Sequence, residues 1–175
     1  SGDAVLCLTS LPDISGDSKD EILAGLDSGQ VLCLSTQSAT EATVLWSVSL
    51  GESVLALLAL PDANSDGWPE VVAATDKGVV TAFQAGGANA GAILWTQTST
   101  CGVNVLSVFQ DRNADGYPEV LFAGADQRVH LVSGKTGVHL WNRYLSASGY
   151  AYVHVVAASQ DLNGDTVFDP VAWTW

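Results

Sequence analysis

Short apolar runs alternate along this chain with clusters of Gly, Ser, Asp and Asn. Little of the sequence follows the period of an amphipathic helix, and the runs rich in Val, Leu, Ala and Thr predict β-strands. The run 54–60 is apolar at every position, which predicts a strand buried on both faces. The run 128–131 alternates better, which predicts a more exposed third strand lying farther out in its unit.

The predicted strands fall into groups of four that repeat about every 49 residues. They cover 4–8, 21–26, 30–34 and 44–48, then 54–60, 70–75, 79–84 and 93–98, then 103–109, 119–123, 129–133 and 139–144, and finally 152–159 and 170–175. Four strands in a unit of this length is typical of a β-propeller blade. The sequence therefore predicts an all-β fold: one β-propeller region or propeller segment over 1–175, with about three and a half blades. The approximate repeats are 4–50, 53–99, 103–146 and an incomplete 152–175.

An acidic nonapeptide precedes the second strand of every unit. Its four copies are Asp13–Glu21, Asp62–Glu70, Asp111–Glu119 and Asp161–Asp169, at spacings of 49, 49 and 50 residues. They hold 13 of the 19 carboxylates of a chain whose net charge is −13. That charge repels nucleic acid and anionic lipid, and we expect neither as a partner. No apolar run approaches the roughly 18 residues that suggest a membrane span.

The nonapeptides have the residue spacing of calcium loops. Side-chain oxygens at positions 1, 3 and 5, a backbone carbonyl at 7 and a carboxylate at 9 would supply the oxygen ligands that Ca²⁺ favours. The predicted ligands are Asp13, Ser15, Asp17, Lys19 and Glu21; Asp62, Asn64, Asp66, Trp68 and Glu70; Asp111, Asn113, Asp115, Tyr117 and Glu119; and Asp161, Asn163, Asp165, Val167 and Asp169. The sequence predicts two to four bound Ca²⁺ ions.

The alternative of an EF-hand is excluded by position 12. An EF-hand needs an acidic residue there and a following helix, whereas Ala24, Ala73, Phe122 and Ala172 occupy it within predicted strands. The loops also differ from one another at position 6, where a left-handed backbone favours glycine. Loops two and three have glycine there and fit the motif best, loop four has Thr166, and loop one has Ser18.

Two further elements recur in the units. A Leu-Trp pair lies in the fourth predicted strand at 45–46, 94–95 and 140–141, which suits an aromatic packed between blades. The tripeptides 27–29, 76–78 and, loosely, 126–128 predict hairpin turns, whose aspartates are turn formers in preference to metal ligands. The third unit is predicted to carry one extra residue before its turn, consistent with a bulge.

The D-x-N-x-D-G-x-x-E loops leading into apolar strands resemble FG-GAP repeats, the calcium-loop blades of integrin-type propellers. The outer part of each blade is similar to PQQ-like propeller repeats, whose T-G-x-x-x-W signature is complete in 136–141. In the second unit only Gly91 and Trp95 of that signature are kept, and in the first only Trp46. The resemblance implies a calcium-stabilised propeller or a segment of one.

Function is predicted to be binding without catalysis. His130, His139 and His154 are scattered over predicted strands, which favours hydrogen-bonded strand histidines over general bases. We therefore expect a non-enzymatic, calcium-stabilised scaffold for adhesion or for binding a protein or glycan. The calcium-rich space outside cells or the periplasm would suit loops of modest affinity. The alternatives are part of a quinoprotein-like, PQQ-dependent dehydrogenase propeller, or a lectin that uses Trp68 and Tyr117.

The incomplete fourth unit has a consequence for assembly. An open arc of three and a half blades exposes apolar blade faces. We therefore expect a homo-oligomer or the remainder of a larger propeller. Cys7, Cys33 and Cys101 lack the spacing of a zinc site, and the sequence leaves open whether two of them form a disulfide.

Overall fold

The computed structural model describes residues 3–36, 38, 40–145, 153–166 and 168–174 and places fourteen strands among them. The first blade contains β1 (Val5–Leu11), β2 (Glu21–Leu26), β3 (Gln30–Thr36) and β4 (Ala42–Ser49). The second contains β5 (Val54–Leu60), β6 (Glu70–Thr75), β7 (Val79–Gln84) and β8 (Ile93–Thr98). The third contains β9 (Val103–Phe109), β10 (Glu119–Gly124), β11 (Arg128–Ser133) and β12 (His139–Tyr144), and β13 (Val153–Ala158) and β14 (Pro170–Thr174) form a half blade.

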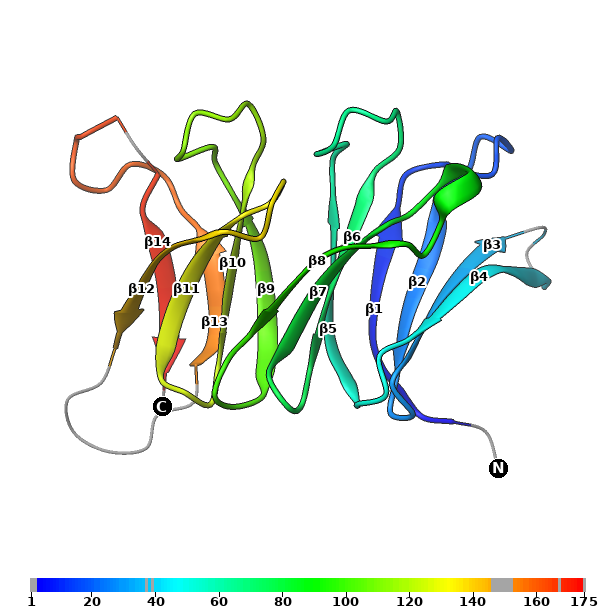
Figure 1. Ribbon diagram of the computed structural model, residues 1–175, viewed down its shortest axis with the longest axis horizontal. Helices are drawn as coiled ribbons and strands as arrows, with labels where there is room; N and C mark the ends of the chain where they lie inside the picture. Colours follow the sequence, from blue (N-terminus) through cyan, green and yellow to red (C-terminus); the bar gives the residue numbers. More distant parts are fainter. Residues whose placement is uncertain (1–2, 37, 39, 146–152, 167, 175) are drawn as a thin grey trace.

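Each blade is an antiparallel meander in which strands pair in chain order. The sheets stand side by side in an open arc, with β1, β5, β9 and β13 as the first strand of each, and all four nonapeptide loops lie along one edge (Figure 1). The all-β propeller prediction is confirmed. The strand bounds also match closely, since the largest change is the extension of β1 to Leu11; positions 152 and 175 of the predicted last strands lie outside the described residues.

Two bulges recur at fixed places in the blades. The first strand of every blade carries one extra residue near its start: Leu6, Leu55, Asn104 and His154. The fourth strand of every complete blade carries another, and it is the leucine of the Leu-Trp pair: Leu45, Leu94 and Leu140. A bulge bends its strand and increases the local twist. The Leu-Trp pair therefore marks the place where the outer strand is irregular.

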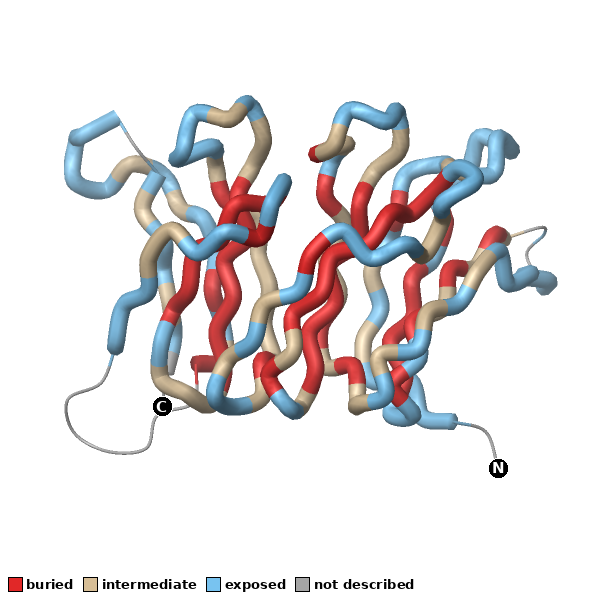
Figure 2. Tube along the Cα trace, viewed as in Figure 1, coloured by how far each residue is buried: buried red, intermediate tan, exposed pale blue. Residues whose placement is uncertain are grey.

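Burial peaks in the second and third strands (Figure 2). Every residue of β6 and β10 is buried, whereas β5 alternates between buried and half-buried positions. The prediction of a first strand buried throughout is therefore wrong, because that strand lies at the edge of its sheet. The prediction of an exposed third strand is also wrong: in β11 only Arg128 is exposed. The third strand has paired strands on both sides, and the fourth strand takes the exposed position.

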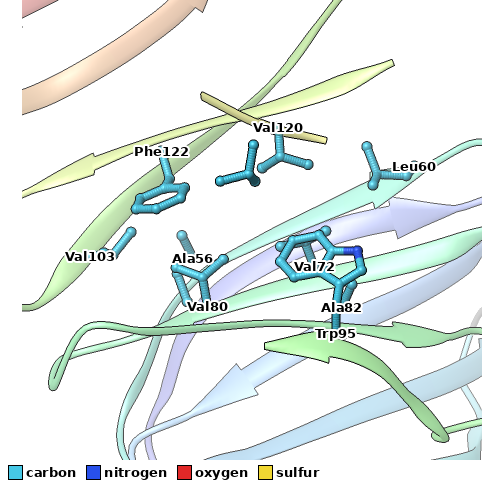
Figure 3. Packing of buried hydrophobic residues seen from close by; sticks show 11 residues of the cluster. Ala56, Leu60, Val72, Val80, Ala82, Trp95, Val103, Val120 and Phe122 are labelled. Carbon is cyan, nitrogen blue, oxygen red and sulfur yellow. The ribbon is translucent and has the colours of Figure 1, made fainter. Parts of the chain in front are cut away.

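The tryptophans of the Leu-Trp pairs join neighbouring blades, as predicted. Trp95 lies beside Val72 and Ala82 of its own blade, in a cluster that also contains Val120 and Phe122 of the next blade (Figure 3). Its indole Nε1 donates a hydrogen bond to the Gly134 carbonyl at 2.9 Å. Trp46 repeats this bond one blade earlier, and its Nε1 donates to a carbonyl of the second blade at 2.7 Å. In both cases the acceptor lies 39 residues along the chain, just after the third strand.

The turn between the second and third strands of the third blade differs from the predicted one. The residue pairs flanking the turn, Ala74↔Val80 and Ala123↔Val129, enclose the same number of residues. The third blade therefore has no extra residue here, and the true equivalent of Gly78 is Gln127. Gln127 takes a φ of 62°, close to the left-handed conformation that Gly29 and Gly78 adopt in the other blades. The predicted alignment of the third turn was wrong because Gln127 occupies the position at which the first two blades have glycine.

The described part of the chain contains little helix. One short 3₁₀ helix, η1 (Gly87–Asn89), lies between β7 and β8. Among the described residues, none of the helices has the length and apolar character needed to span a bilayer. Cys7, Cys33 and Cys101 are all free thiols, which answers the question of a disulfide that the sequence left open.

Candidate metal site

The aspartate at position 1 organises each of the four nonapeptide loops. One oxygen of its carboxylate accepts the backbone N–H of position 4, and the other accepts the N–H of position 6. For Asp62 these bonds come from Ser65 at 2.6 Å and Gly67 at 2.8 Å. Asp13, Asp111 and Asp161 repeat both bonds within 2.6–2.9 Å. In loop two, burial opposes the effect, but the backbone N–H groups together hold the pKa of Asp62 below its ordinary value.

The side chains at positions 3, 5 and 9 also contact backbone N–H groups. At position 5, Asp17, Asp66 and Asp115 accept the N–H of position 7 at 2.9–3.0 Å. At position 3, Asn64, Asn113 and Asn163 accept the N–H of position 5 at 2.8–2.9 Å. At position 9, Glu21, Glu70, Glu119 and Asp169 accept the N–H of position 2 at 2.6–2.9 Å. The sequence repeat therefore has one shared loop conformation, held by its own carboxylates.

Two backbone positions in each loop have positive φ. The sequence predicted this for position 6, where Ser18, Gly67, Gly116 and Thr166 have φ of 67–89°. It missed position 4, where Gly16, Ser65, Ala114 and Gly164 have φ of 60–83°. Every loop has one glycine and one other residue at these two positions. Each loop therefore has one non-glycine residue with positive φ, and the glycines at position 6 do not by themselves set loops two and three apart.

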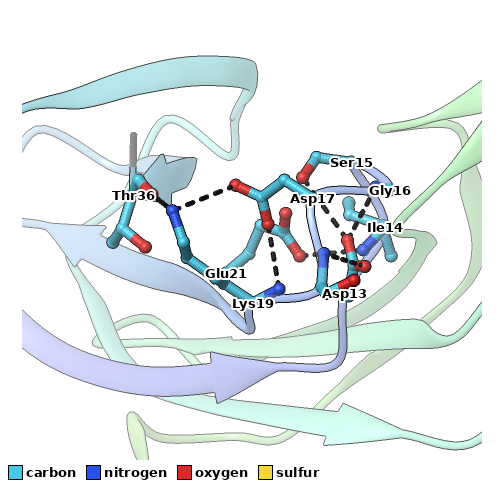
Figure 4. A network of polar contacts seen from close by, with 9 residues as sticks. Asp13, Ile14, Ser15, Gly16, Asp17, Lys19, Glu21 and Thr36 are labelled. Atoms are coloured by element: carbon cyan, nitrogen blue, oxygen red, sulfur yellow. Dashed lines mark hydrogen bonds and ion pairs between the residues drawn. The ribbon is translucent and has the colours of Figure 1, made fainter. Parts of the chain in front are cut away.

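In loops one and two, three carboxylates converge on one point. Ligand-capable oxygens of Asp13, Asp17 and Glu21 lie within 4.8 Å of one another, and those of Asp62, Asp66 and Glu70 do the same. Figure 4 shows this network in loop one, where the Lys19 ammonium lies between the Thr36 carbonyl, at 3.1 Å, and Asp17 Oδ2, at 3.8 Å. The two glutamates are at most 1% exposed. One oxygen of each, Oε1, is buried without a hydrogen-bond partner.

A buried carboxylate oxygen without a partner is costly, and more so beside other carboxylates. Burial, opposed by the Ala63 N–H and reinforced by the charges of Asp62 and Asp66, raises the pKa of Glu70 to about 7. A hard cation between the three carboxylates would supply the missing partner and neutralise their repulsion. The residues of loops one and two therefore fit a Ca²⁺ ion.

Loop three satisfies its carboxylates from within the protein. Glu119 Oε1 accepts two loop N–H groups, and Oε2 accepts the N–H of Gly134 at 3.3 Å. Ser133 Oγ donates to Asp115 Oδ2 at 3.1 Å. Burial opposes the effect, but hydrogen bonds from the Asn113 side chain, the Tyr117 N–H and Ser133 Oγ, together with the charge of Lys135, hold the pKa of Asp115 below its ordinary value. The sequence missed Ser133, Gly134 and Lys135, at the end of β11 and just after it, because they lie at least 14 positions after the loop they support.

Loop four ends in a shorter carboxylate that is only half-buried. Asp169 Oδ1 accepts Nδ2 of Asn163 at 3.3 Å, a contact within the loop. Among the described residues, neither loop three nor loop four brings three carboxylates as close together as loops one and two do. The predicted ligand Val167 lies outside the described residues.

The aromatic residues at position 7 pack within the molecule. Trp68 is half-buried and lies directly over Gly86 and Gly87, where a β-carbon would clash with its ring. The Tyr117 hydroxyl hydrogen-bonds to Ser65 Oγ of loop two, and the Lys135 ammonium lies 4.5 Å from the centre of the Tyr117 ring. These contacts connect loops two and three with the blades beneath them.

A serine, an aspartate and a histidine do meet at the opposite edge of the third blade. Ser99 Oγ donates to Asp126 Oδ2 at 3.0 Å, and His130 Nε2 lies 2.6 Å from the same oxygen. The carboxylate stands between the other two groups, so His130 is not placed to take a proton from Ser99. His130 also stacks on Phe122, with ring centres 4.6 Å apart. This is the hydrogen-bonded strand histidine that the sequence predicted for this position.

The Asp126–His130 pair makes stability depend on pH. Burial opposes the effect, but the hydrogen bond from His130 leads the contacts that hold the pKa of Asp126 below its ordinary value of 3.8. The pair therefore stabilises the fold above that value, and the contribution is lost as the pH falls through the lowered pKa. We expect Asp126→Asn to cost about 1–3 kcal/mol at pH 7. Urea unfolding should show a smaller stability difference between the two proteins at pH 3 than at pH 7; an equal difference at both values would contradict this.

No family model matches the sequence, and no curated protein matches it either. The fold, however, is similar to that of many solved β-propeller chains. BBS1N in complex with ARL6DN superposes with a TM-score of 0.66 at 13% identity, over 97% of this chain and 45% of that one. A chain of the polycomb repressive complex 2 of Chaetomium thermophilum superposes with a TM-score of 0.67 at 14% identity, over 89% of this chain and 33% of that one. Sqt1 of Saccharomyces cerevisiae superposes with a TM-score of 0.63 at 12% identity, over 81% of this chain and 38% of that one.

These comparisons define the class of protein by fold alone. At such low identity a shared architecture carries no residue roles. The chain spans less than half the length of each of these structures. It is thus an arc of β-propeller blades with an acidic loop at the same edge of every blade.

Proposed function

We propose that this chain is a calcium-stabilised, non-catalytic propeller scaffold, placed outside the cell or in the periplasm, that binds a protein or glycan partner. One observation carries the calcium proposal: Glu21 and Glu70 each place a buried carboxylate oxygen without a hydrogen-bond partner against two more carboxylates. Such a cluster is costly without a cation. Calcium, once bound, supplies two positive charges to each cluster.

The predicted ligands of loops one and two hold these ions: Asp13, Ser15, Asp17, Lys19 and Glu21, and Asp62, Asn64, Asp66, Trp68 and Glu70. Loops three and four take ions more weakly, because their ninth carboxylate is satisfied by protein groups or is half-exposed. This ranking of the loops by calcium affinity differs from the ranking predicted from glycine at position 6, in which loops two and three bind best. The number of tightly bound ions is therefore two, the lower end of the range predicted from sequence.

The scaffold role is supported by the fold and by the contacts of the candidate catalytic and sugar-binding residues, which are with other groups of the protein. Ser99, Asp126 and His130 are bound to one another in an order unsuited to nucleophilic catalysis. Trp68 and Tyr117, which a lectin would use against sugar rings, are in contact with neighbouring residues. The BBS1N propeller is solved in complex with a protein, ARL6DN. Extracellular calcium concentrations suit modules with dissociation constants of about 10⁻⁴–10⁻³ M.

Calorimetric titration of the metal-free protein with CaCl₂ tests this proposal. We expect two ions per chain in the tight phase, one for Glu70→Gln and none for the double variant Glu21→Gln/Glu70→Gln. Glu119→Gln is the matched control and should keep both tight sites. Absence of binding at millimolar calcium, or unchanged stoichiometry in the double variant, would contradict the assignment. MgCl₂ in place of CaCl₂ should bind more weakly, because Mg²⁺ demands stricter octahedral geometry.

A further inference from the structure

The asparagine at position 3 of loops two, three and four makes the same main-chain contact in each loop. Asn64, Asn113 and Asn163 each accept, through Oδ1, the backbone N–H two residues along the chain at 2.8–2.9 Å. This contact is an Asx turn, in which the side chain folds back along the peptide that follows it. In all three loops the side-chain amide is therefore turned toward the next backbone nitrogen.

The residue after this asparagine sets loop four apart from loops two and three. It is Gly164 in loop four, and Ser65 and Ala114 in the other two. Gly164 is exposed, and among the described residues a β-carbon built on it would have no heavy atom beyond its chain neighbours within 4 Å. The approach to the Gly164 nitrogen is therefore open, whereas a β-carbon stands beside the corresponding nitrogen in the other two loops.

Hydrogen bonds in loop four favour attack of the Gly164 nitrogen on the side-chain amide of Asn163. The Gly164 N–H donates to Asp161 Oδ1 at 2.6 Å, so the proton that this nitrogen would lose already has an acceptor. The Asp165 N–H donates to Asn163 Oδ1 at 2.9 Å and would stabilise negative charge on that oxygen. Loops two and three share both of these bonds, so the glycine is the main difference. The nitrogen that would leave, Asn163 Nδ2, donates to Asp169 Oδ1 at 3.3 Å, a longer bond than the 2.8–3.0 Å bonds of the equivalent amides.

We propose that Asn163 is a site of spontaneous deamidation, in which the side-chain amide becomes a carboxylate by way of a succinimide ring shared with Gly164. The Gly164 nitrogen attacks Cγ of Asn163 and forms a C–N bond. The bond between Cγ and Nδ2 then breaks, and Nδ2 leaves as ammonia with the proton from the Gly164 nitrogen. Water opens the ring at either carbonyl and leaves aspartate or isoaspartate. The reacting atoms are neighbours in the chain, so the reaction needs water and no other reactant.

The product with an unaltered main chain has one carboxylate more in loop four. Asp161, Asp165 and Asp169 are the acidic residues of that nonapeptide, and aspartate at position 3 would add a fourth. Since calcium affinity depends on the number of charged ligands, loop four would then bind the ion more tightly. This consequence rests on the proposed calcium function, whereas the deamidation itself does not.

Peptide mass spectrometry on the folded chain tests the proposal. The protein is kept in EDTA at pH 8, so that calcium occupies none of the loops, and samples taken over time are digested under acidic conditions. We expect acid to replace amide at Asn163 at least about tenfold faster than at Asn64 or Asn113, which serve as internal controls. Equal rates at the three asparagines would overturn the proposal. Reaction at Asn163 only after unfolding in urea would overturn it as well, since the fold would then protect the site.

Exchanging the residue after the asparagine tests the role of the glycine. Gly164→Ala should slow the reaction at Asn163 to the rate of Asn113, because loop three has Ala114 at this position with a φ of 60°. The reverse change, Ala114→Gly, should speed up the reaction at Asn113 by a similar factor, and glycine adopts that backbone freely. Circular dichroism shows whether each variant is folded. Unchanged rates in both variants would contradict the proposal.

The Asn163→Asp variant tests the consequence for calcium separately. In calorimetric titration it should bind one tight ion more than the wild-type chain. An unchanged number of ions would show that the added carboxylate does not complete a site in loop four. Absence of tight binding in the wild type as well would contradict the calcium function itself, and the peptide masses decide the deamidation in either case.

Discussion

Removing calcium is expected to lower the unfolding temperature of this protein by roughly 10–20 °C. Free calcium at about 100 times the dissociation constant of a site stabilises the folded state by about 2.7 kcal/mol. Two such sites, in loops one and two, contribute about 5 kcal/mol together. For a chain of this size each kcal/mol shifts the midpoint by roughly 2–4 °C. Calorimetric scans in excess CaCl₂ and in EDTA measure the difference. An unchanged unfolding midpoint would contradict the proposed metal sites.

The effect of the variant Glu70→Gln on the unfolding temperature is expected to change sign between calcium and EDTA. In calcium the variant loses one site and unfolds roughly 5–11 °C below the wild type. In EDTA at pH 8 it unfolds at the same temperature or above, because the neutral amide removes a buried charge that burial and two nearby aspartates disfavour. Asp62 and Asp66 remain as acceptors for the new amide group.

Glu119→Gln is the control for this sign change. Both oxygens of Glu119 accept backbone N–H groups, so an amide leaves at least one of those donors without an acceptor. We expect a loss of about 1–3 kcal/mol in calcium and in EDTA alike. If Glu70→Gln were equally destabilised in both buffers, loop two would be a structural turn of the same kind as loop three.

Trp95→Ala is expected to cost about 3–5 kcal/mol of unfolding free energy, whether or not calcium is present. The side chain is 7% exposed and fills the space between the second and third blades. Its loss leaves a cavity and removes the hydrogen bond to the Gly134 carbonyl. Urea unfolding followed by far-ultraviolet circular dichroism measures the change.

Two further variants show how much of the stability loss in Trp95→Ala comes from its position between the blades. Trp95→Phe keeps an aromatic ring between the blades and loses the indole donor, so it should cost less than Trp95→Ala. Ile93→Ala removes an apolar side chain from the exposed side of the same strand and should change stability by less than about 0.5 kcal/mol. A similar loss for Ile93→Ala and Trp95→Ala would contradict an inter-blade role for the tryptophan.

Most of the fold could be read from the sequence because each blade repeats its own local signals. The bounds of β5 to β8 were predicted to the residue, since apolar runs are separated there by acidic loops and glycine turns. Where a local signal is missing, prediction failed. Gln127 adopts the backbone of a glycine without being one, and the third hairpin was therefore aligned one residue out of register.

The order of burial across a blade could not be predicted in the same way. An apolar run such as 54–60 has the composition of a fully buried strand, yet β5 stands at the edge of its sheet. The neighbours that bury β6 and β7 come from other blades. Hydrophobic pattern reports which side chains avoid water; it does not report how many sheets surround them.

The sequence by itself determined the repeat, the number of blades and the twenty residues of the four acidic loops, because these depend on spacing along one chain. Only the tertiary structure decided which loops leave a buried carboxylate oxygen without a hydrogen-bond partner. Glu21 and Glu70 are left with a partnerless oxygen, whereas Glu119 receives the N–H of Gly134, which follows β11 and lies beside Glu119 only in the fold. The cost of a buried carboxylate depends on every group around it, and those groups come from distant parts of the chain.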